Sequence, residues 1–465
     1  MNMKSMTLSE IAVAVGGRLV NAADAEQSTI TQVVMDSRQD VTGALFVAIA
    51  GQRVDGHDFV ADVLARGAVC ALAEREIAGT SGAYILVDST LRAIRDLAAY
   101  YRGLFSIPVI GITGSVGKTS TKEMISATLG VKFDVLKTEG NLNNEIGVPM
   151  TLFRLREHHQ AAVIEMGISD FGEMTRLTEM VRPDIAIITI IGYAHLDNLG
   201  DRNGVLRAKT EIFKGLPPQG IALVSGDDDL LRPSAITDFV PHQTKVRKII
   251  YGMSGGNDYR AVDITSQGTD KTDTSCTLLW GDTALDVTIP SFGVAAVYAA
   301  LAAAAVGDML GLTGDEIRRG IAGFSNVSGR VTVHKTPRFI VIDDCYNANP
   351  SSVTASVTSL SELTGRRVAI LGDMAELGPD EAKLHYEIGA YIAAAGLDLT
   401  LCVGTLSRHT YQGVLDASDV NTQHFAAKAD LLAVLPNLVQ DGDQILVKAS
   451  RSRQFEEIVA ALQTM

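Results

Sequence analysis

The segment VIGITGSVGKTSTKEMI, residues 109–125, constrains the fold of this chain more than any other segment. It runs from an apolar strand through a glycine-bearing turn into a helix that is expected to begin near Thr119. Gly114 and Gly117 let the backbone turn its N–H groups toward an anion, and the N-terminus of the helix adds its positive dipole end. This layout is typical of a nucleotide phosphate loop in an α/β domain with a mainly parallel sheet.

Two side chains of this segment suit phosphate chemistry. Lys118 is placed to reach the β and γ phosphates of a nucleotide, and Thr119 to bind a Mg²⁺ ion that bridges them. The match to the pattern GxxxxGK[ST] is off by one residue, because Ile112 occupies the first glycine position and Gly111 lies one residue early. An ordinary strand-to-helix turn with a surface lysine is the alternative, and the flanking strand and helix favour the phosphate loop.

The length and charge of the chain limit the classes of protein to which it can belong. Its 465 residues are too many for one core and predict about three domains. The net charge of −14 argues against a nucleic-acid partner, because phosphate backbones require clustered Lys and Arg. The longest apolar stretch, residues 294–306, is shorter than the roughly 20 residues of a membrane span.

The N-terminus has no signal-peptide pattern, and the four cysteines are isolated from one another in the sequence. Their spacing predicts neither a zinc motif nor a disulfide framework. We therefore expect a cytoplasmic monomer that has no membrane span and binds no nucleic acid.

Residues 1–106 are expected to form a small α/β domain. Its strand and helix signals alternate and lie at residues 45–50, 68–73, 84–88 and 90–105. Loops at strand ends are where α/β folds bind ligands. The candidate ligand residues in such loops are Ser37 and Arg38 of a DSR motif and Asp55, Gly56 and His57 of a DGH motif. A capped turn with a solvated arginine explains the DSR motif equally well.

Residues 107–323 are expected to form a central nucleotide-binding domain. Continuous apolar runs at residues 161–166, 185–191 and 221–226 predict parallel strands that are buried on both faces. Glu165, His195 and Lys209 follow or end these runs. Residues at the carboxyl ends of neighbouring parallel strands meet at one edge, so a metal and phosphate role is favoured over helix caps or surface groups.

The rest of the central domain carries weaker signals. The segment GNLNNEIGVP, residues 140–149, is a ligand loop or, equally, a pair of consecutive turns. Short strands between residues 250 and 290 predict an antiparallel flap, which helices at 294–306 and 313–322 follow.

Residues 324–465 predict a third, Rossmann-like α/β domain. Its strands are expected at residues 339–343, 367–372, 399–404 and 444–450, in alternation with helices. This alternation predicts a largely parallel sheet.

The motifs of all three domains, taken in order, resemble those of the Mur ligases, the ATP-dependent amide-forming enzymes of peptidoglycan synthesis. They are DSR, DGH, TGSVGKTSTKEM, GNLNNEIGVP, EMG, AHLD, AKTEIF, DDCYNANPSS, LGDMAELG and VKASR. DDCYNANP and LGDMAELG look like signatures of the members that add D-alanyl-D-alanine to UDP-N-acetylmuramoyl-tripeptide. The resemblance covers nearly the whole chain.

The resemblance implies ATP and Mg²⁺ as cofactors and an acyl-phosphate intermediate. The first domain would bind the UDP-sugar substrate, the central domain ATP, and the third domain would close over ATP and bind the incoming dipeptide. Because the ligands lie on different domains, an open conformation should be populated without them. The resemblance implies a catalytic role for Lys118, Glu165, His195, Lys209 and Arg330.

The resemblance also assigns ligands to individual residues. The metal would be held by Thr119, Glu165, His195 and Lys209, with Lys209 carrying a carbamate that turns the cation into an anionic oxygen ligand. The nucleotide would be bound by Thr113, Gly114, Ser115, Gly117, Lys118, Thr119, Ser120, Asn144, Arg330 and Asp344. The two other substrates would be bound by Ser37, Arg38, Asp55, Gly56, His57, Asn141, Asn143, Tyr346, Asn347, Asn349 and Lys448.

Two departures from the family pattern concern the adenine region. Ile190 stands where the family usually has Asn in TNIG, and Ala295 and Ala299 replace the usual His and Asn before the alanine-rich helix. Lost hydrogen bonds of this kind cost about 1 kcal/mol each, so adenine recognition is expected to be weaker or to use other groups.

Two alternatives remain at this stage. One is a ligase of the same superfamily, of the folylpolyglutamate or cyanophycin-synthetase type, although DSR and DGH argue against it. The other is a catalytically silent nucleotide-binding scaffold, which would have no use for Lys118, Glu165, His195, Lys209 and Arg330 together.

Overall fold

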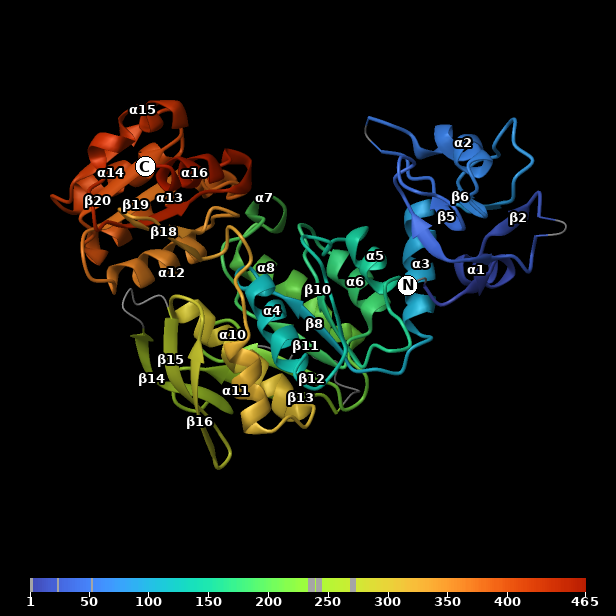
Figure 1. Cartoon of the computed structure of the whole chain (residues 1–465), viewed down its shortest axis with the longest axis horizontal. Coiled ribbons are helices and arrows are strands. Elements are labelled where there is room, and N and C mark those ends of the chain that lie inside the picture. The colour runs from blue at the N-terminus through green and yellow to red at the C-terminus, as the bar shows by residue number, and fades with distance from the viewer. Residues whose placement is uncertain (1–2, 23–24, 52, 233–238, 240–244, 268–272) are drawn as a thin grey trace.

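The computed structural model describes the chain except residues 1–2, 23–24, 52, 233–238, 240–244 and 268–272. Three α/β domains follow one another along the long axis of the molecule, with the N-terminal domain at one end and the C-terminal domain at the other (Figure 1). Within the described part, no helix is long and apolar enough to cross a membrane.

The N-terminal domain is built on a five-stranded sheet. Its strand order is β2-β7-β6-β5-β4, in which β4 to β7 are parallel and β2 is antiparallel to β7. A two-stranded antiparallel pair, β1 with β3, lies beside it. The elements are β1 Met6–Thr7, α1 Leu8–Val15, β2 Arg18–Val20, β3 Thr29–Ile30, β4 Gln32–Val34, β5 Ala44–Val47, η1 Gly56–Phe59, α2 Val60–Ala65, β6 Cys70–Ala73, β7 Tyr84–Leu86 and α3 Thr90–Arg102.

Helix α3 joins the N-terminal domain to the central domain. Ser89 caps its first turn, and the helix packs on α1 of its own domain and on α5 and α6 of the central domain. Glu145 accepts hydrogen bonds from Arg95 of α3 and from Arg176 of the central domain. Arg102 donates to the carbonyl groups of Val181 and Arg182. These polar contacts across a shared apolar core fix the two domains to each other.

A nine-stranded sheet forms the central domain, in the order β16-β15-β14-β13-β12-β11-β8-β10-β9. Its strands are β8 Val109–Thr113, β9 Val135–Lys137, β10 Ala161–Glu165, β11 Ile185–Ile188, β12 Ile221–Ser225, β13 Arg247–Gly252, β14 Tyr259–Gln267, β15 Asp273–Trp280 and β16 Thr283–Ile289. The predicted parallel pairing of β8, β10, β11 and β12 is confirmed. The strands between 250 and 290 are antiparallel as expected, but β13 and β14 connect them to the main sheet.

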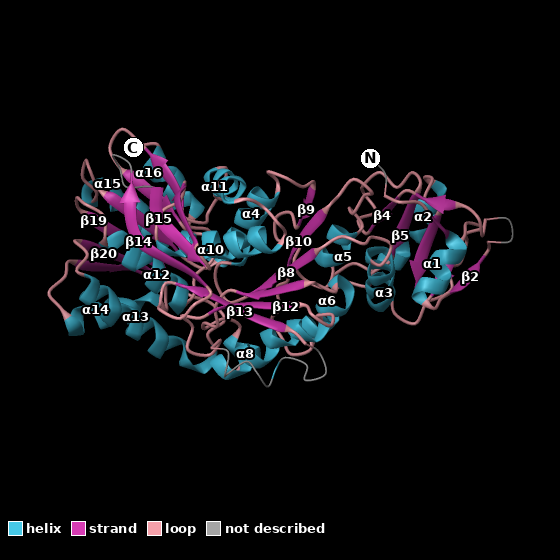
Figure 2. Ribbon diagram, turned by 90° about the horizontal axis from the view of Figure 1, so that it is seen from below, coloured by secondary structure: helices cyan, strands magenta, loops and turns pink. Residues whose placement is uncertain are grey.

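Helices cover both faces of the central sheet (Figure 2). They are α4 Lys118–Leu129, α5 Gly147–Leu152, α6 Glu173–Val181, α7 Leu196–Leu199, α8 Arg202–Thr210, η2 Glu211–Gly215, α10 Val294–Met309 and α11 Gly314–Ala322. The alanine-rich α10 is buried over most of its length and packs closely on α4, because alanine has a high helix propensity and little bulk. It thereby supports the helix that begins at the phosphate loop.

The C-terminal domain has a six-stranded sheet, in the order β17-β18-β22-β19-β20-β21, which is parallel except for β17. Its elements are β17 Thr332–Lys335, β18 Ile340–Asp343, α12 Pro350–Ser361, β19 Arg367–Gly372, η4 Gly378–Asp380, α13 Glu381–Ala395, β20 Leu399–Val403, α14 Ser407–Ala417, β21 Thr422–Phe425, α15 Lys428–Leu438, β22 Gln444–Lys448, η5 Arg451–Arg453 and α16 Glu456–Gln463. The predicted Rossmann-like alternation is present.

The cysteines are distributed over all three domains. Cys70, Cys276, Cys345 and Cys402 are buried and free. Burial raises the pKa of Cys70, Cys276 and Cys402 to about 12 and raises the pKa of Cys345 as well. They behave as small apolar core residues.

Candidate active site

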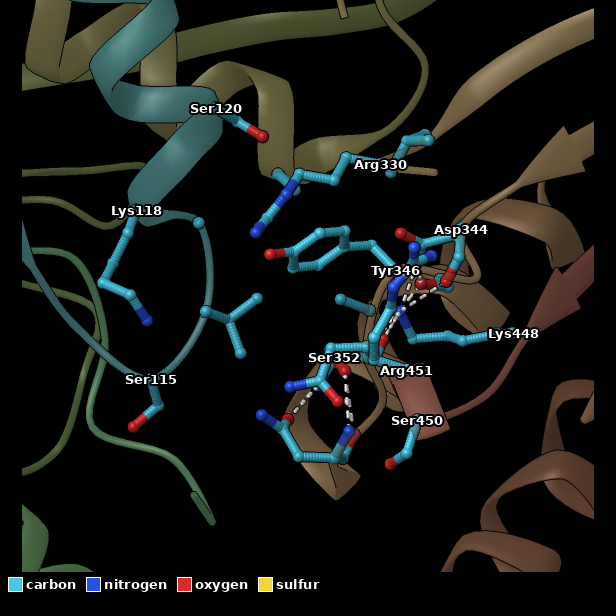
Figure 3. A pocket seen from close by; sticks show the side chains of 18 of the residues that line it. Ser115, Lys118, Ser120, Arg330, Asp344, Tyr346, Ser352, Lys448, Ser450 and Arg451 are labelled. Carbon is cyan, nitrogen blue, oxygen red and sulfur yellow. Dashed lines mark hydrogen bonds and ion pairs between the residues drawn. The ribbon is translucent and has the colours of Figure 1, made fainter. Parts of the chain in front are cut away.

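A cleft of 740 Å³ lies between the central and C-terminal domains (Figure 3). It brings together most of the site residues that the sequence suggested for these two domains: Ser115, Gly117, Lys118, Ser120, Asn141, Asn143, Asn144, Glu165, His195, Arg330, Asp344, Tyr346, Asn347, Asn349 and Lys448. Thr113, Gly114, Thr119 and Lys209 do not line it directly. The five candidates of the N-terminal domain, Ser37, Arg38, Asp55, Gly56 and His57, do not line it either.

The phosphate loop connects β8 to α4 with two glycines at positive φ. Gly114 has a φ of 148°, and Gly117, at the N-terminus of α4, has a φ of 84°. Strand β11 leads into a loop that holds the phosphate loop, because the hydroxyl of Thr189 donates to the carbonyl of Val116 at 2.5 Å. Ser115 exchanges hydrogen bonds with the main chain of Gly192. The loop is therefore preorganised by its neighbour in the sheet.

Lys118 is the first residue of α4 and points into the cleft (Figure 3). Its ammonium group donates to the carbonyl of Gly114 at 2.7 Å. Burial lowers its pKa, the negative charge of Glu165 opposes this, and the positive charge of Arg330 lowers the pKa further. A bound anion would relieve this unfavourable environment, as expected of a phosphate-binding lysine.

Glu165 and Thr119 lie together behind the phosphate loop. The Thr119 hydroxyl donates to one carboxylate oxygen of Glu165 at 2.9 Å, and the Asn143 amide donates to the other at 2.8 Å. Lys122, which is also buried, lies 3.7 Å from the same carboxylate. Glu165 ends β10 as the sequence predicted, and its oxygen atoms with the Thr119 hydroxyl form a set of hard ligands that suits Mg²⁺.

Lys209 lies in α8 with 1% of its surface exposed. Burial, reinforced by the positive charge of Lys118, lowers its pKa well below the ordinary value. Lowering the pKa of a lysine favours its neutral amine, which is the nucleophilic form.

His195 lies immediately before α7 and contacts the C-terminal domain. Its Nδ1 is 2.6 Å from a carboxylate oxygen of Glu376, and this hydrogen bond lowers the pKa of Glu376. The N–H of Leu196 donates to the carbonyl of Glu376 at 3.0 Å. The sequence placed His195 at the edge of the central sheet but did not identify Glu376 as its partner.

Arg330 stacks on the ring of Tyr346 on the opposite wall of the cleft (Figure 3). The guanidinium carbon is 4.0 Å from the ring centre, and the guanidinium carbon of Arg451 is 5.7 Å from the same ring centre. The N–H of Tyr346 donates to the carbonyl of Gly329, which keeps the two segments together. Both arginines lie on the C-terminal wall of the cleft and contact the same aromatic ring, while Arg451 also pairs with Glu456.

Asp344 is held in place by two neighbours. Its carboxylate pairs with the buried ammonium of Lys448 and accepts a hydrogen bond from Ser356 at 2.7 Å. Lys448 also donates to the carbonyl of Asn347. The pair fixes the DDCYNANP loop at the end of β18, so Lys448 has a structural role in addition to any contact with a ligand.

Two asparagines of the cleft accept hydrogen bonds from the main chain where helices begin. Asn349 is the N-cap of α12 and accepts from the N–H of Ser352 at 2.9 Å. Asn144 accepts from the N–H groups of Ile146 and Gly147 at the start of α5. These side chains use their carbonyl oxygen on the main chain, which leaves their amide N–H groups for a ligand.

In the N-terminal domain, the DGH residues stabilise their own loop. The Asp55 carboxylate caps η1 and is 2.6 Å from Nδ1 of His57, while Nε2 of His57 accepts from the N–H of Glu74. His57 is buried with both ring nitrogens engaged. Asp36 and Arg38 form an ion pair at the surface, with the Arg38 side chain 88% exposed, so this arginine is available to a ligand.

Of the three residues that depart from the family pattern, Ala295 lines the cleft, whereas Ile190 and Ala299 do not. Ala295 lines the cleft beside Phe292 and Ser359, and Ala299 is buried in α10. Ile190 uses its main-chain carbonyl to accept from the N–H of Ser115. Ala295 is therefore the one of these three positions that presents an apolar side chain to the cleft.

Comparison with known protein families supports the assignment of this architecture. Three family models match consecutive parts of the chain: Mur ligase family, catalytic domain, at residues 29–102; Mur ligase middle domain at 112–307; and Mur ligase, glutamate ligase domain, at 329–451. The UDP-N-acetylmuramoyl-tripeptide–D-alanyl-D-alanine ligase of Escherichia coli (strain K12) is 38% identical, with 99% of each chain covered. The chain belongs to the Mur ligase family.

Further relatives agree with this assignment. The ligase of the same name from Bacillus subtilis (strain 168) is 36% identical, again with 99% of each chain covered. A crystal structure of MurF from Acinetobacter baumannii superposes with a TM-score of 0.92 at 32% identity and covers both chains fully. The MurF ligase from Thermotoga maritima, solved in complex with ADP, has a TM-score of 0.84 at 28% identity and covers 93% of this chain and 97% of that one.

Proposed function

We propose that this Mur ligase joins D-alanyl-D-alanine to UDP-N-acetylmuramoyl-tripeptide at the expense of ATP, giving the pentapeptide precursor of peptidoglycan. The observation that carries the proposal is the cleft in which the phosphate loop of the central domain faces the DDCYNANP loop of the C-terminal domain. Relatives at 38% and 36% identity carry these two substrates in their names.

The reaction has two steps. In the first step, two anions must come into contact. The tripeptide carboxylate attacks the γ phosphorus of ATP, and the bond to the β–γ bridging oxygen breaks, so that ADP leaves and an acyl phosphate remains. The amine of the dipeptide then attacks the acyl carbon, loses a proton and displaces phosphate. Lys118 and Arg330, on opposite walls, neutralise the charges that gather between them.

The ligand set fits Mg²⁺, which would supply charge neutralisation on the phosphates. Thr119 and Glu165 would hold one ion through oxygen atoms that already lie together. His195 and Lys209 would serve a second ion, and Lys209 can do so only after its amine has reacted with CO₂. That reaction forms an N–C bond and releases a proton, leaving an anionic carbamate.

The burial and lowered pKa of Lys209 support carbamylation, because a neutral amine is the reactive form. We expect the intact protein at neutral pH to carry the mass of one added CO₂, which disappears after acid treatment and returns with bicarbonate. Activity should follow the same course, and Lys209→Arg should be inactive at all bicarbonate concentrations. An unmodified Lys209 in fully active protein would contradict this assignment.

The remaining residues are assigned to substrates. Asp344 would bind the ribose of ATP, and Thr113, Gly114, Ser115, Gly117, Ser120 and Asn144 would surround its phosphates. The dipeptide would lie near Asn141, Asn143, Tyr346, Asn347, Asn349 and Lys448. The UDP-sugar would bind to the N-terminal domain at Ser37, Arg38, Asp55, Gly56 and His57. The N-terminal domain would end at residue 106 and the central domain at residue 323.

We also propose that the protein acts as a cytoplasmic monomer. One chain supplies both walls of the cleft. Its cysteines are unpaired, as is usual in a reducing compartment.

The deciding experiment measures phosphate release from Mg-ATP with UDP-N-acetylmuramoyl-tripeptide, with and without D-alanyl-D-alanine, together with the mass of the product. Dipeptide-dependent release with a pentapeptide product is expected. Release that depends on glutamate instead would indicate a ligase of the folylpolyglutamate type, and nucleotide binding without any release would indicate a silent scaffold.

The same assay with other nucleoside triphosphates tests the base site. Because Ile190, Ala295 and Ala299 offer no polar side chain, we expect weaker discrimination against other purines than a site with hydrogen-bonding side chains would give.

A further inference from the structure

The contact between His195 and Glu376 joins two domains at one pair of residues. His195 belongs to the central domain and precedes α7, whereas Glu376 lies in the loop between β19 and η4 of the C-terminal domain. A side-chain hydrogen bond of 2.6 Å and a main-chain hydrogen bond of 3.0 Å, from Leu196 to the Glu376 carbonyl, lie side by side. In Figure 1, α7 lies on the side of the central domain that faces the C-terminal domain.

Both residues adopt a backbone conformation that is unfavourable for a residue with a side chain. The φ angles of His195 and Glu376 are 55° and 62°. Such a conformation brings the Cβ atom close to the main chain and persists only where the surroundings determine it. Because both loops adopt an unfavourable backbone conformation at the contact, we infer that the surrounding structure maintains this contact.

The loop that carries Glu376 is itself fixed. The N–H of Met374 donates to Nε2 of His385 at 3.0 Å, and the N–H of Ala375 donates to the Ser450 hydroxyl at 2.8 Å. Glu376 is therefore presented to the central domain from a main chain that is held in place immediately before it.

The chemistry of the contact determines the state of the His195 ring. A carboxylate only accepts hydrogen bonds, so Nδ1 of His195 carries a proton and Nε2 is the nitrogen left to bind a metal ion when the ring is neutral. His195 lines the cleft with Glu165 and Lys118. A hydrogen bond on one ring nitrogen commonly orients the other nitrogen toward a metal ion.

We propose that Glu376 is a positioning residue for His195, so that the imidazole is oriented for its metal only when the C-terminal domain has closed on the central domain. This inference rests on the proposed function, in which His195 is a metal ligand. Because the two partners belong to different domains, closure over the substrates and completion of the metal site become one event. The metal site would then be incomplete in the open enzyme.

The first test reads the tautomer of His195 directly and does not require catalysis. In ¹⁵N-histidine-labelled protein held closed by an ATP analogue and both substrates, the signal that His195→Gln removes should have the shifts of a ring protonated at Nδ1. Glu376→Ala should move this signal toward a mixture of tautomers. Glu387→Ala, which removes an exposed carboxylate from α13 of the same domain, should leave it unchanged. A His195 signal that does not respond to Glu376→Ala would overturn the proposal.

The second test measures the dependence of turnover on Mg²⁺. Glu376→Ala should raise the Mg²⁺ concentration for half-maximal activity about tenfold, with the KM for the tripeptide substrate unchanged. In a His195→Ala background, the same substitution should have no further effect. Additive losses with a raised KM for the dipeptide would mean that Glu376 contacts the substrate directly, which would also overturn the proposal.

The two tests separate this inference from the proposed function. If the wild-type protein released no phosphate, the function would be wrong, and the tautomer of His195 would still report whether Glu376 orients the ring.

Discussion

Lys118 is a half-buried cation at the wall of the cleft, and its surroundings in the free protein are unfavourable. Its described hydrogen bond is to one carbonyl, and burial together with the charge of Arg330 lowers its pKa. The phosphates of a nucleotide would provide the missing negative charge. The residue is therefore stabilised most when the reacting groups are in place, which is the condition for electrostatic catalysis.

We expect Lys118→Ala to lower kcat by at least about 100-fold, because the transition state loses a preorganised positive charge. Phosphate release in the presence of both substrates measures this effect. Lys383→Ala, which removes an exposed lysine of α13, is the matched control and should retain full activity. A Lys118→Ala enzyme with kcat close to that of the wild type would contradict the assignment.

For individual residues, the sequence predicted where a site residue lies in its strand or helix better than which side chains it contacts. Lys118 and Glu165 could be placed because each lies at a strand end or a helix start, which are local features. The contact of His195 with Glu376 could not, because the two residues are far apart in the sequence and meet only after two domains have packed. The engagement of both ring nitrogens of His57 is likewise a tertiary property.

At the scale of the element, the phosphate loop depends on the strand beside it. Gly114 has a positive φ, and a Cβ atom at this position would lie 1.9 Å from the hydroxyl of Thr189. The loop and the end of β11 therefore approach more closely than any side chain would allow. This explains why a glycine is required one residue after β8.

We expect Gly114→Ala to weaken nucleotide binding more than tenfold, which corresponds to about 1.4 kcal/mol, since the loop must shift to relieve the contact. Calorimetric titration with ADP measures this loss of affinity. Gly396→Ala is the control, because Gly396 also has a positive φ but has open space around its Cβ position. That substitution should lower stability by about 1 kcal/mol and leave ADP binding unchanged. Equal ADP affinities for the two variants would refute this account.

The loop after β19 depends on a neutral histidine. His385 is fully buried, accepts from the N–H of Met374 through Nε2 and lies 2.7 Å from the Glu381 carbonyl through Nδ1. Burial lowers its pKa from the ordinary value of 6.5. At a pH between the lowered pKa of the folded protein and the ordinary pKa of the unfolded chain, the unfolded chain binds a proton at this histidine and the folded protein does not. The free energy of unfolding therefore falls as the pH falls.

The pH dependence of stability should therefore change in His385→Gln. The stabilising contribution is complete above pH 6.5 and is lost as the pH falls through the lowered pKa of the folded protein. The free energy of unfolding, measured with denaturant between pH 7.5 and 5, should decline less steeply for His385→Gln than for the wild type. This pH window is set by the ordinary histidine pKa of about 6.5. His158→Gln, at an exposed position, should follow the wild type. Parallel declines for all three proteins would contradict this role.

Most elements could be predicted from the sequence, whereas their pairing could be predicted only in part. Buried parallel strands such as β10, β11 and β12 are continuous apolar runs, which identifies them locally. The connection of β13 and β14 to the central sheet was not predicted, because strands that alternate apolar and polar residues do not reveal which edge they join. The edge strands β17 and β21 were also missed, since each is short and only half buried.

At the scale of the whole molecule, the two outer domains are attached differently. The N-terminal domain is joined through α3, with Glu145 paired to Arg95 and Arg176. The C-terminal domain meets the central domain around a cleft of 740 Å³ that its ligands would fill. We infer that the C-terminal domain is the one that moves.

We expect the protein without ligands to populate an open form, and the radius of gyration from small-angle scattering to decrease when an ATP analogue and both substrates are added. Scattering profiles that stay identical with and without all ligands would show that no such closure takes place.

The four buried cysteines make these motions accessible to distance measurements. Maleimides react with the thiolate, and burial raises the pKa of every native thiol, so the native chain should remain unlabelled at neutral pH. A pair of cysteines introduced on the surfaces of two domains would then be the only sites for fluorophores. The native cysteines would thus add no label in single-molecule spectroscopy, and no core residue has to be replaced.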